Sequence, residues 1–251
     1  MSFQPIVPLS GYTGWRFLQR TLDAQQATFQ NSEPISRASD YFRKNISSIE
    51  TAEDLVNDRR LLEVALGAFG LEDDINNKFF IQKILEDGTV NPDALGNRLA
   101  DNRYASLSES FGFGDFARPL TTISTVSEKI ISQFETQRFE TAVGEQNNDL
   151  RLALNFASGI DDIVSDTASG NAQWFSVMGN PPVRQVVQTA LGLPSQIASI
   201  DLDQQLEIFQ SRTETLFGTS SVQDLNDPEL QEKMIRLFLI RSESAAFTGT
   251  S

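Results

Sequence analysis

The sequence predicts an all-α fold of two quasi-repeated multi-helix lobes joined by a long, broken helix. Strand signals are scarce, because no alternating β-branched run of roughly four to eight residues lies between turn residues. Apolar residues recur at helical spacings instead, and residues that start or stop helices separate the segments. An internal sequence similarity without gaps predicts that the two lobes are repeats of each other.

This similarity relates residues 55–71 to residues 177–193 at a constant offset of 122 residues, the separation of Gly70 and Gly192. Eight apolar positions coincide in the seventeen-residue window, more than a 39% apolar composition places together by chance. We therefore predict a duplicated helical module. Superposed segments with discordant helix directions would contradict it.

Residues 1–14 hold two prolines and two glycines, which predict a flexible N-terminal lead. Lobe 1 is expected over residues 15–120, and its first amphipathic helix begins near Trp15. Thr51 and Asp54 have the spacing of a capping box, with Asp in place of Glu. Further helices of lobe 1 are expected over residues 33–45, 59–69, 73–85, 92–101 and 104–111.

The connecting helix region is expected over residues 121–158. Within it, residues 122–156 form the longest uninterrupted helical pattern, but the apolar stripe shifts near Gly144 and the polar run 145–149. This shift predicts a break in the helix. Lobe 2, a degenerate repeat of lobe 1, is expected over residues 159–244, and residues 245–251 form a frayed tail.

The charge of the chain limits its partners. The net charge is −14 and the pI is about 4.4. Such a surface repels phosphate backbones and anionic lipids, so we expect no nucleic-acid partner. No apolar run approaches the ~20 residues that cross a bilayer, so no membrane insertion is expected. The N-terminus lacks the features of a cleaved signal peptide, which predicts a cytoplasmic protein or one exported without such a signal.

The chain contains neither Cys nor His. Disulfides, thiolate metal sites, cysteine catalysis and Ser–His–Asp triads are therefore excluded. Carboxylates remain, but adjacent pairs such as Asp161 and Asp162 cannot face each other across a cleft. The loops that begin at Asp87 and Asp224 do not match the EF-hand pattern. We predict no catalytic residue, no metal ligand and no cofactor.

Two segments are candidates for a partner surface. The first follows the lead and combines Trp with Arg, residue types that are enriched at interfaces, although core anchoring by the Trp is the simpler interpretation. The second is an aromatic loop rich in Gly. The candidate residues are Trp15, Arg16, Arg20, Phe111, Phe113 and Phe116.

Several stretches resemble a known family. They include Trp15–Thr21 (WRFLQRT), Ala65–Leu71 (ALGAFGL), Asn77–Phe80 (NKFF), Leu99–Tyr104 (LADNRY) and Arg138–Glu140 (RFE). With these stretches the chain resembles domain-of-unknown-function 1217 (DUF1217), an alphaproteobacterial family. The resemblance implies a genetic context, because such proteins tend to be encoded among flagellar genes. It carries no catalytic motif over to this chain.

The expected function is that of a non-enzymatic, flagellum-associated structural or accessory protein that acts through protein–protein contacts, with flagellar components as candidate partners. A cytoplasmic secretion chaperone or adaptor fits the same features. A carboxylate-dependent, Mg-assisted hydrolase ranks below both, and a small-molecule-binding module between helices is a further alternative. The oligomeric state stays open.

Overall fold

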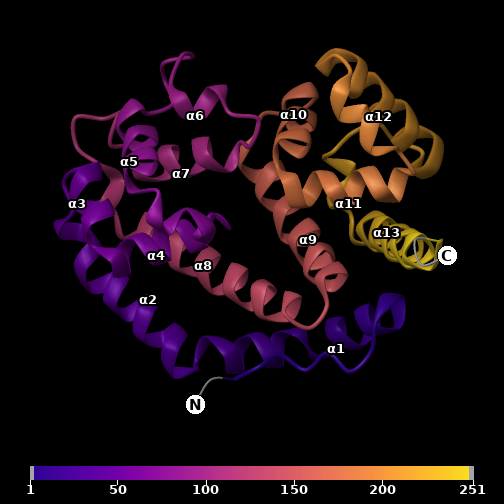
Figure 1. Cartoon of the computed structure of the whole chain (residues 1–251), viewed down its shortest axis with the longest axis horizontal. Coiled ribbons are helices and arrows are strands. Elements are labelled where there is room, and N and C mark those ends of the chain that lie inside the picture. The colour runs from indigo at the N-terminus through magenta and orange to yellow at the C-terminus, as the bar shows by residue number, and fades with distance from the viewer. Residues whose placement is uncertain (1–2, 249–251) are drawn as a thin grey trace. The chain divides into compact units, whose positions relative to one another are not determined.

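The computed structural model describes residues 3–248 of the chain. Over this range it contains thirteen α-helices, five short 3-10 helices and no strand, which confirms the predicted all-α fold (Figure 1). The chain divides into two compact units. Unit 1 comprises Met1–Pro5 and Leu22–Ala142, and unit 2 comprises Ile6–Thr21 and Val143–Ser251.

Unit 1 is built around α4 (Arg59–Ala68), which packs against α2 (Glu33–Asn45) and α3 (Ala52–Asn57). Its core includes Phe42, Leu61 and Phe134, all fully buried. The remaining elements of this unit are η1 (Ile46–Ser48), η2 (Glu72–Asn76), α5 (Lys78–Asp87), α6 (Leu95–Arg98), α7 (Arg103–Phe111), η3 (Leu120–Thr122), and parts of α1 (Gly11–Gln30) and α8 (Ser124–Gly144).

Unit 2 is built around α11 (Pro181–Leu191), which packs against its four neighbouring α-helices. Trp174 and Phe209 lie in this core, and their ring centroids are 6.1 Å apart. The four neighbours are α9 (Asn148–Asp166), α10 (Asn171–Gly179), α12 (Leu202–Phe217) and α13 (Pro228–Thr248). The unit also contains the short helices η4 (Ser195–Ser199) and η5 (Asp224–Asn226) and the first part of α1.

The predicted break in the long helical pattern is confirmed. The first helix, α8, ends at Gly144, and α9 begins at Asn148. The Asn147 side chain caps α9 by accepting a hydrogen bond from the Leu150 N–H at 3.0 Å. A Cβ on Gly144 would lie 2.5 Å from Cδ of Arg151, so the turn also requires a glycine for space.

The two segments of the predicted repeat have the same local structure. In each, a helix ends before a capping residue at equivalent positions, Asp58 and Asn180. A second helix follows, and the chain then turns through a glycine with φ of +65° at Gly70 and +68° at Gly192. The duplication of whole lobes stays a prediction.

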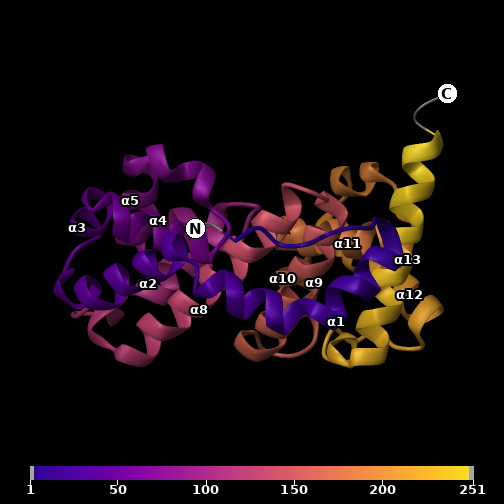
Figure 2. The same cartoon turned by 90° about the horizontal axis from the view of Figure 1, so that it is seen from below.

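The ends of the chain differ from the expectation. Residues 11–14 are helical rather than part of a flexible lead, and α1 begins at Gly11 because side chains of its first turns are held by α13. Residues 6–21 accordingly belong to unit 2. Figure 2 shows α13 as one continuous helix, which extends to Thr248 through part of the expected tail. Residues 1–2 of the lead and 249–251 of the tail lie outside the described residues.

The expected helix over residues 92–101 is reduced to the short α6. Asn91 accepts a hydrogen bond from the Asp93 N–H at 3.0 Å, and Asn97 donates to the backbone oxygens of Thr89 and Asn91. These side chains compete with helical hydrogen bonding and fold the segment into turns.

Among the described helices, none is both long and apolar enough to cross a membrane.

Candidate functional site

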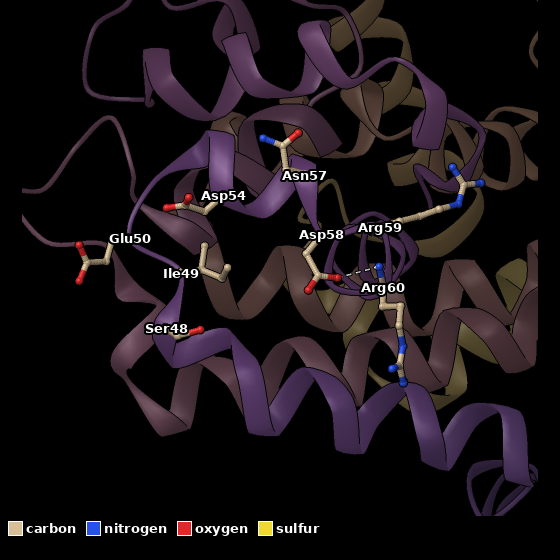
Figure 3. A pocket seen from close by; sticks show the side chains of 8 residues that line it. All are labelled: Ser48, Ile49, Glu50, Asp54, Asn57, Asp58, Arg59 and Arg60. Carbon is tan, nitrogen blue, oxygen red and sulfur yellow. Dashed lines mark hydrogen bonds between the residues drawn. The ribbon is translucent and has the colours of Figure 1, made fainter.

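A polar hollow of about 620 Å³ opens on unit 1 between η1, α3 and the start of α4 (Figure 3). Three of its lining residues, Ile49, Asp54 and Asp58, take part in helix caps, because helix ends meet there. It is lined by Ser48, Ile49, Glu50, Asp54, Asn57, Asp58, Arg59 and Arg60.

Both carboxylate oxygens of Asp58 accept hydrogen bonds from neighbouring residues. Its Oδ1 accepts hydrogen bonds from the N–H groups of Arg60 and Leu61 at 3.0 and 3.1 Å, which caps α4. Its Oδ2 accepts from the Tyr41 hydroxyl at 2.7 Å, and this bond raises the pKa of Tyr41. The Arg60 guanidinium lies 3.6 Å from the centroid of the Tyr41 ring. The group therefore stabilises the start of α4.

The other charged groups of the hollow do not converge on a reacting centre. Asp54 closes the predicted capping box, accepting from the Thr51 N–H at 3.1 Å and from its hydroxyl at 2.7 Å. Figure 3 shows Arg59 directed away from Asp54 and Glu50, and Arg59 donates instead to Asn76 at 3.3 Å. Asp54, like Asp58, therefore serves a helix cap.

The described carboxylates form no candidate metal centre. Across residues 3–248, no three acidic side chains are grouped so that they could hold a metal ion. The pKa is lowered from its ordinary value for several described carboxyls, whereas a general acid near neutral pH needs a raised pKa. These carboxyls are Asp87, Asp115, Glu128 and Glu232.

The six candidate partner residues fall into two sets, one in each unit. Two of their aromatic members are buried, because Trp15 is 3% exposed and Phe111 is 1% exposed. Phe113 is half-buried, with its ring stacked on that of Phe111 at 5.8 Å. The remaining three are exposed: Arg16, Arg20 and Phe116.

Trp15 is buried because it belongs to a hydrogen-bonded cluster, here called the Glu232 clasp. Four donors on one face of α1, at the helical spacings 3, 1 and 3, converge on the Glu232 carboxylate of α13. They are the Tyr12 hydroxyl at 2.6 Å, the Trp15 indole N–H at 2.9 Å, the Gln19 amide at 3.0 Å and the Arg16 guanidinium at 3.4 Å.

Burial alone would raise the pKa of Glu232, but the hydrogen bonds from Tyr12, Trp15 and Gln19, together with the charge of Arg16, lower it below its ordinary value. The sequence analysis missed Glu232, because its partners lie more than 210 residues away along the chain.

The aromatic loop of unit 1 is fixed by Asp115, which the sequence analysis did not single out. Its carboxylate accepts hydrogen bonds from the Thr89 N–H at 2.7 Å, the Thr89 hydroxyl at 2.9 Å and the Val90 N–H at 2.9 Å. These bonds hold two exposed apolar residues on adjoining loops, Val90 (79% exposed) and Phe116 (56% exposed). We call this pair the Val90–Phe116 surface.

A family model described as "Protein of unknown function (DUF1217)" matches residues 68–230. The chain belongs to the DUF1217 family. The match includes the Val90–Phe116 surface, whereas Glu232 and its partners in α1 lie outside it.

Among solved structures, the chain is similar to the X-ray crystal structure of a protein from Agrobacterium tumefaciens. The two sequences are 27% identical, the TM-score is 0.76, and the similarity covers 97% of this chain and 99% of the other. A comparison with curated proteins found no match to this chain. The fold of this chain is therefore similar to that of the Agrobacterium protein over nearly the full length of both chains.

Proposed function

We propose that this protein is a non-enzymatic, flagellum-associated structural or accessory protein that acts through contacts with another protein. The observation that carries the proposal is the Val90–Phe116 surface. Isolated exposed apolar side chains are common on soluble proteins, but these two are held on adjoining loops by the same carboxylate. Loops that are already fixed by hydrogen bonds lose little backbone freedom when a partner covers them.

The free energy gained by burying Val90 and Phe116 is of the size expected for a protein–protein contact. Full burial of an apolar side chain of this size contributes about 1.5–3 kcal/mol, so this pair supplies the centre of a modest interface. The net charge of −14 favours the approach of a basic partner. Two carboxylates of the hollow in unit 1, Asp54 and Asp58, are engaged in capping helices.

The flagellar part of the proposal rests on the resemblance to a family whose members tend to be encoded among flagellar genes. The absence of Cys suits a chain that is exported unfolded. A cytoplasmic secretion chaperone or adaptor would use the same surface without leaving the cell.

A fractionation experiment separates these two roles. A tagged chromosomal copy is followed by immunoblot in the cytoplasm, the purified flagellar fraction and the culture supernatant, with and without a working flagellar export apparatus. Export-dependent appearance outside the cell is the expected result. Strict retention in the cytoplasm would replace the structural role with that of an adaptor.

The contact surface is tested separately by affinity capture of partners from the same cells. The double variant Val90→Ser with Phe116→Ser should lose the captured partner, while retaining the thermal stability of the wild type. Leu202→Ser is the matched control, because Leu202 is 51% exposed at the start of α12. Equal loss of the partner in both variants, or retention in both, would show that the Val90–Phe116 surface is not the contact.

A further inference from the structure

We propose that the N-terminal segment of one copy of this chain, residues 6–21, docks on unit 2 of a second copy when the turn between α8 and α9 straightens. The docking surface is the face of α13 that carries the Glu232 clasp. Within one chain, the same segment belongs to the same unit. The segment exchange is reciprocal, so two copies form a dimer in which each clasp joins different chains.

The helix α1 is divided between the two compact units. Its residues 11–21 belong to unit 2, whereas residues 22–30 belong to unit 1. The chain passes from unit 1 to the rest of unit 2 near the turn between α8 and α9, since unit 1 ends at Ala142. Residues 6–21 are therefore a part of unit 2 that is attached to it through the whole of unit 1. Segment exchange between copies requires this arrangement.

The contact between the segment and unit 2 is selective. Three neutral donors and one guanidinium converge on Glu232, and the Trp15 ring is buried beside them. At the start of α1, Gly11 lies so close to α13 that a Cβ there would overlap the Glu243 carboxylate. All these contacts lie within unit 2, so the segment of a second copy would form the same ones.

The turn between α8 and α9 interrupts a sequence that is otherwise suited to one helix. No proline lies between Pro119 and Pro181, and Gly144 is the single glycine of residues 122–156. The turn consists of residues 145–147. Each helix end leaves up to four backbone groups without a helical hydrogen bond, and joining α8 to α9 would supply those bonds at two ends. A continuous helix is therefore an accessible alternative to the turn.

Local contacts stabilise the turn against the continuous helix. Asn147 caps α9, and its own N–H donates to the Val143 backbone oxygen at 2.9 Å. A Cβ on Gly144 would lie 2.5 Å from Cδ of Arg151. In a continuous helix these two positions are about 10 Å apart along the axis, so the need for glycine disappears.

Straightening the turn leaves both cores intact, because α8 and α9 serve different units. Phe134 of α8 is buried in unit 1, and Leu154 of α9 is buried in unit 2. The segment is affected, however, since α1 is also held in unit 1 through residues 22–30. A straightened turn therefore carries unit 2 away from its own segment and leaves Glu232 open to the segment of another copy.

Two variants of the turn should act in opposite directions on the dimer. Asn148→Pro keeps the turn, because Asn148 is the exposed first residue of α9 and the preceding residue is already extended, with φ −154° and ψ 105°. Proline at this position prevents a continuous helix. Gly144→Ala combined with Asn147→Ala weakens the turn instead, by crowding Arg151 and removing the cap of α9.

Size-exclusion chromatography with light scattering measures the dimer of the full chain, in about 0.3 M salt so that repulsion between copies of charge −14 is screened. We expect the double alanine variant to dimerise at least about tenfold more tightly than the wild type, because both copies straighten a weakened turn. Asn148→Pro should stay monomeric. Leu202→Pro, at the equivalent first position of α12, is the matched control and should behave as the wild type does.

A dimer as abundant in Asn148→Pro as in the double alanine variant would show that association does not need a straightened turn, and would overturn the proposal. A double variant that keeps the helix content of the wild type by circular dichroism but stays monomeric would overturn it as well. If the double variant does not fold, the comparison of the wild type with Asn148→Pro at high concentration decides: the wild type alone should form a dimer.

Cross-linking identifies which chain provides the segment. Arg16→Lys, introduced into the wild-type sequence, places an amine beside Glu232, and a carbodiimide couples the two. Chains with ¹⁴N and ¹⁵N are mixed in equal amounts, unfolded together and refolded. In the dimer, about half of the cross-links between position 16 and Glu232 should join a light chain to a heavy one, as random pairing predicts. Cross-links confined to single chains would refute segment exchange.

This inference is independent of the proposed partner contact. Val90 and Phe116 lie neither in the turn nor in the Glu232 clasp. Loss of the captured partner in the surface variants therefore leaves the dimer unchanged, and a monomeric Asn148→Pro variant still captures the partner.

Discussion

Glu232→Gln keeps the shape of the clasp while removing its charge, so it isolates what the carboxylate contributes to holding α1. In the wild type, both carboxylate oxygens accept hydrogen bonds from α1. The amide oxygen of Gln can still accept from one side. Its NH₂ group then faces donors on the other side, and at least one of those donors loses its partner.

The cost follows from the burial of the donors. Gln19 is exposed and Tyr12 is half-buried, so both can turn to water when the carboxylate is lost. Trp15 is buried, and its indole N–H cannot. An unpaired buried donor costs about 1–3 kcal/mol, and each hydrogen bond to a charged group contributes about 1.5–3 kcal/mol. We expect Glu232→Gln to lower the free energy that holds residues 11–21 by about 2 kcal/mol.

Hydrogen exchange measured by mass spectrometry reports this free energy locally. Amides of residues 15–21 should exchange roughly 30-fold faster in the variant, since each 1.4 kcal/mol changes an opening equilibrium tenfold. Amides of α11 should be little affected. Glu207→Gln, an exposed carboxylate on α12, serves as the matched control and should leave exchange in α1 unchanged.

The pH dependence provides an independent check. Because the pKa of Glu232 is lowered from its ordinary value of 4.5, its contribution is fully present above pH 4.5 and is lost as the pH falls through the lowered pKa. Protection of residues 15–21 should therefore decrease on acidification in the wild type and much less in Glu232→Gln. Equal protection of the wild type and the variant at neutral pH would refute the clasp as the restraint on α1.

Three further predictions test other contacts. The pKa values of all three tyrosines lie above 10.0. Hydrogen bonds to carboxylates are the main cause for Tyr12 and Tyr41, whereas burial is the main cause for Tyr104, whose pKa is raised to about 12. Ultraviolet titration should thus show less phenolate at pH 10.0 in the folded protein than in the unfolded chain, and stability should fall as the pH rises further, because the unfolded chain releases these protons more readily. Gly88→Ala should destabilise the protein by at least about 2 kcal/mol, because the new Cβ would lie 2.2 Å from the Asp115 carboxylate. Gly170 also has a positive φ, but no atom lies near the position of its Cβ, so Gly170→Ala should cost only about 1 kcal/mol. Equal losses of stability in the two variants on urea unfolding would contradict this. Asp58→Ala should cost about 1–2 kcal/mol by the same measurement, through loss of the α4 cap, and no loss would show that the cap is dispensable.

Local chemistry made much of the fold predictable from the sequence. The capping box at Thr51 and the break after Gly144 depend on residues within a few positions of each other, and both are present. Equivalent positions of the two repeat segments, Leu61 and Val64 on α4 and Val183 and Val186 on α11, are buried, as the apolar spacing within each helix predicts. These features need no knowledge of distant segments.

The candidate sites were less predictable. The pattern around Trp15 is the same for an exposed anchor and for a core residue, and only the presence of Glu232 on α13 decides between them. Asp115 likewise acts on Thr89 and Val90, 25 and 26 residues earlier in the chain.

The sequence by itself determined that this protein is all-helical, acidic and without Cys or His chemistry, and it determined most helix ends. Composition and short-range spacing carry that information, because capping and amphipathicity act within a turn or two of helix. The tertiary structure alone decided which aromatic residues are buried and which unit holds the start of the first helix. These outcomes depend on contacts between residues far apart in the chain, and helical periodicity carries no record of such partners.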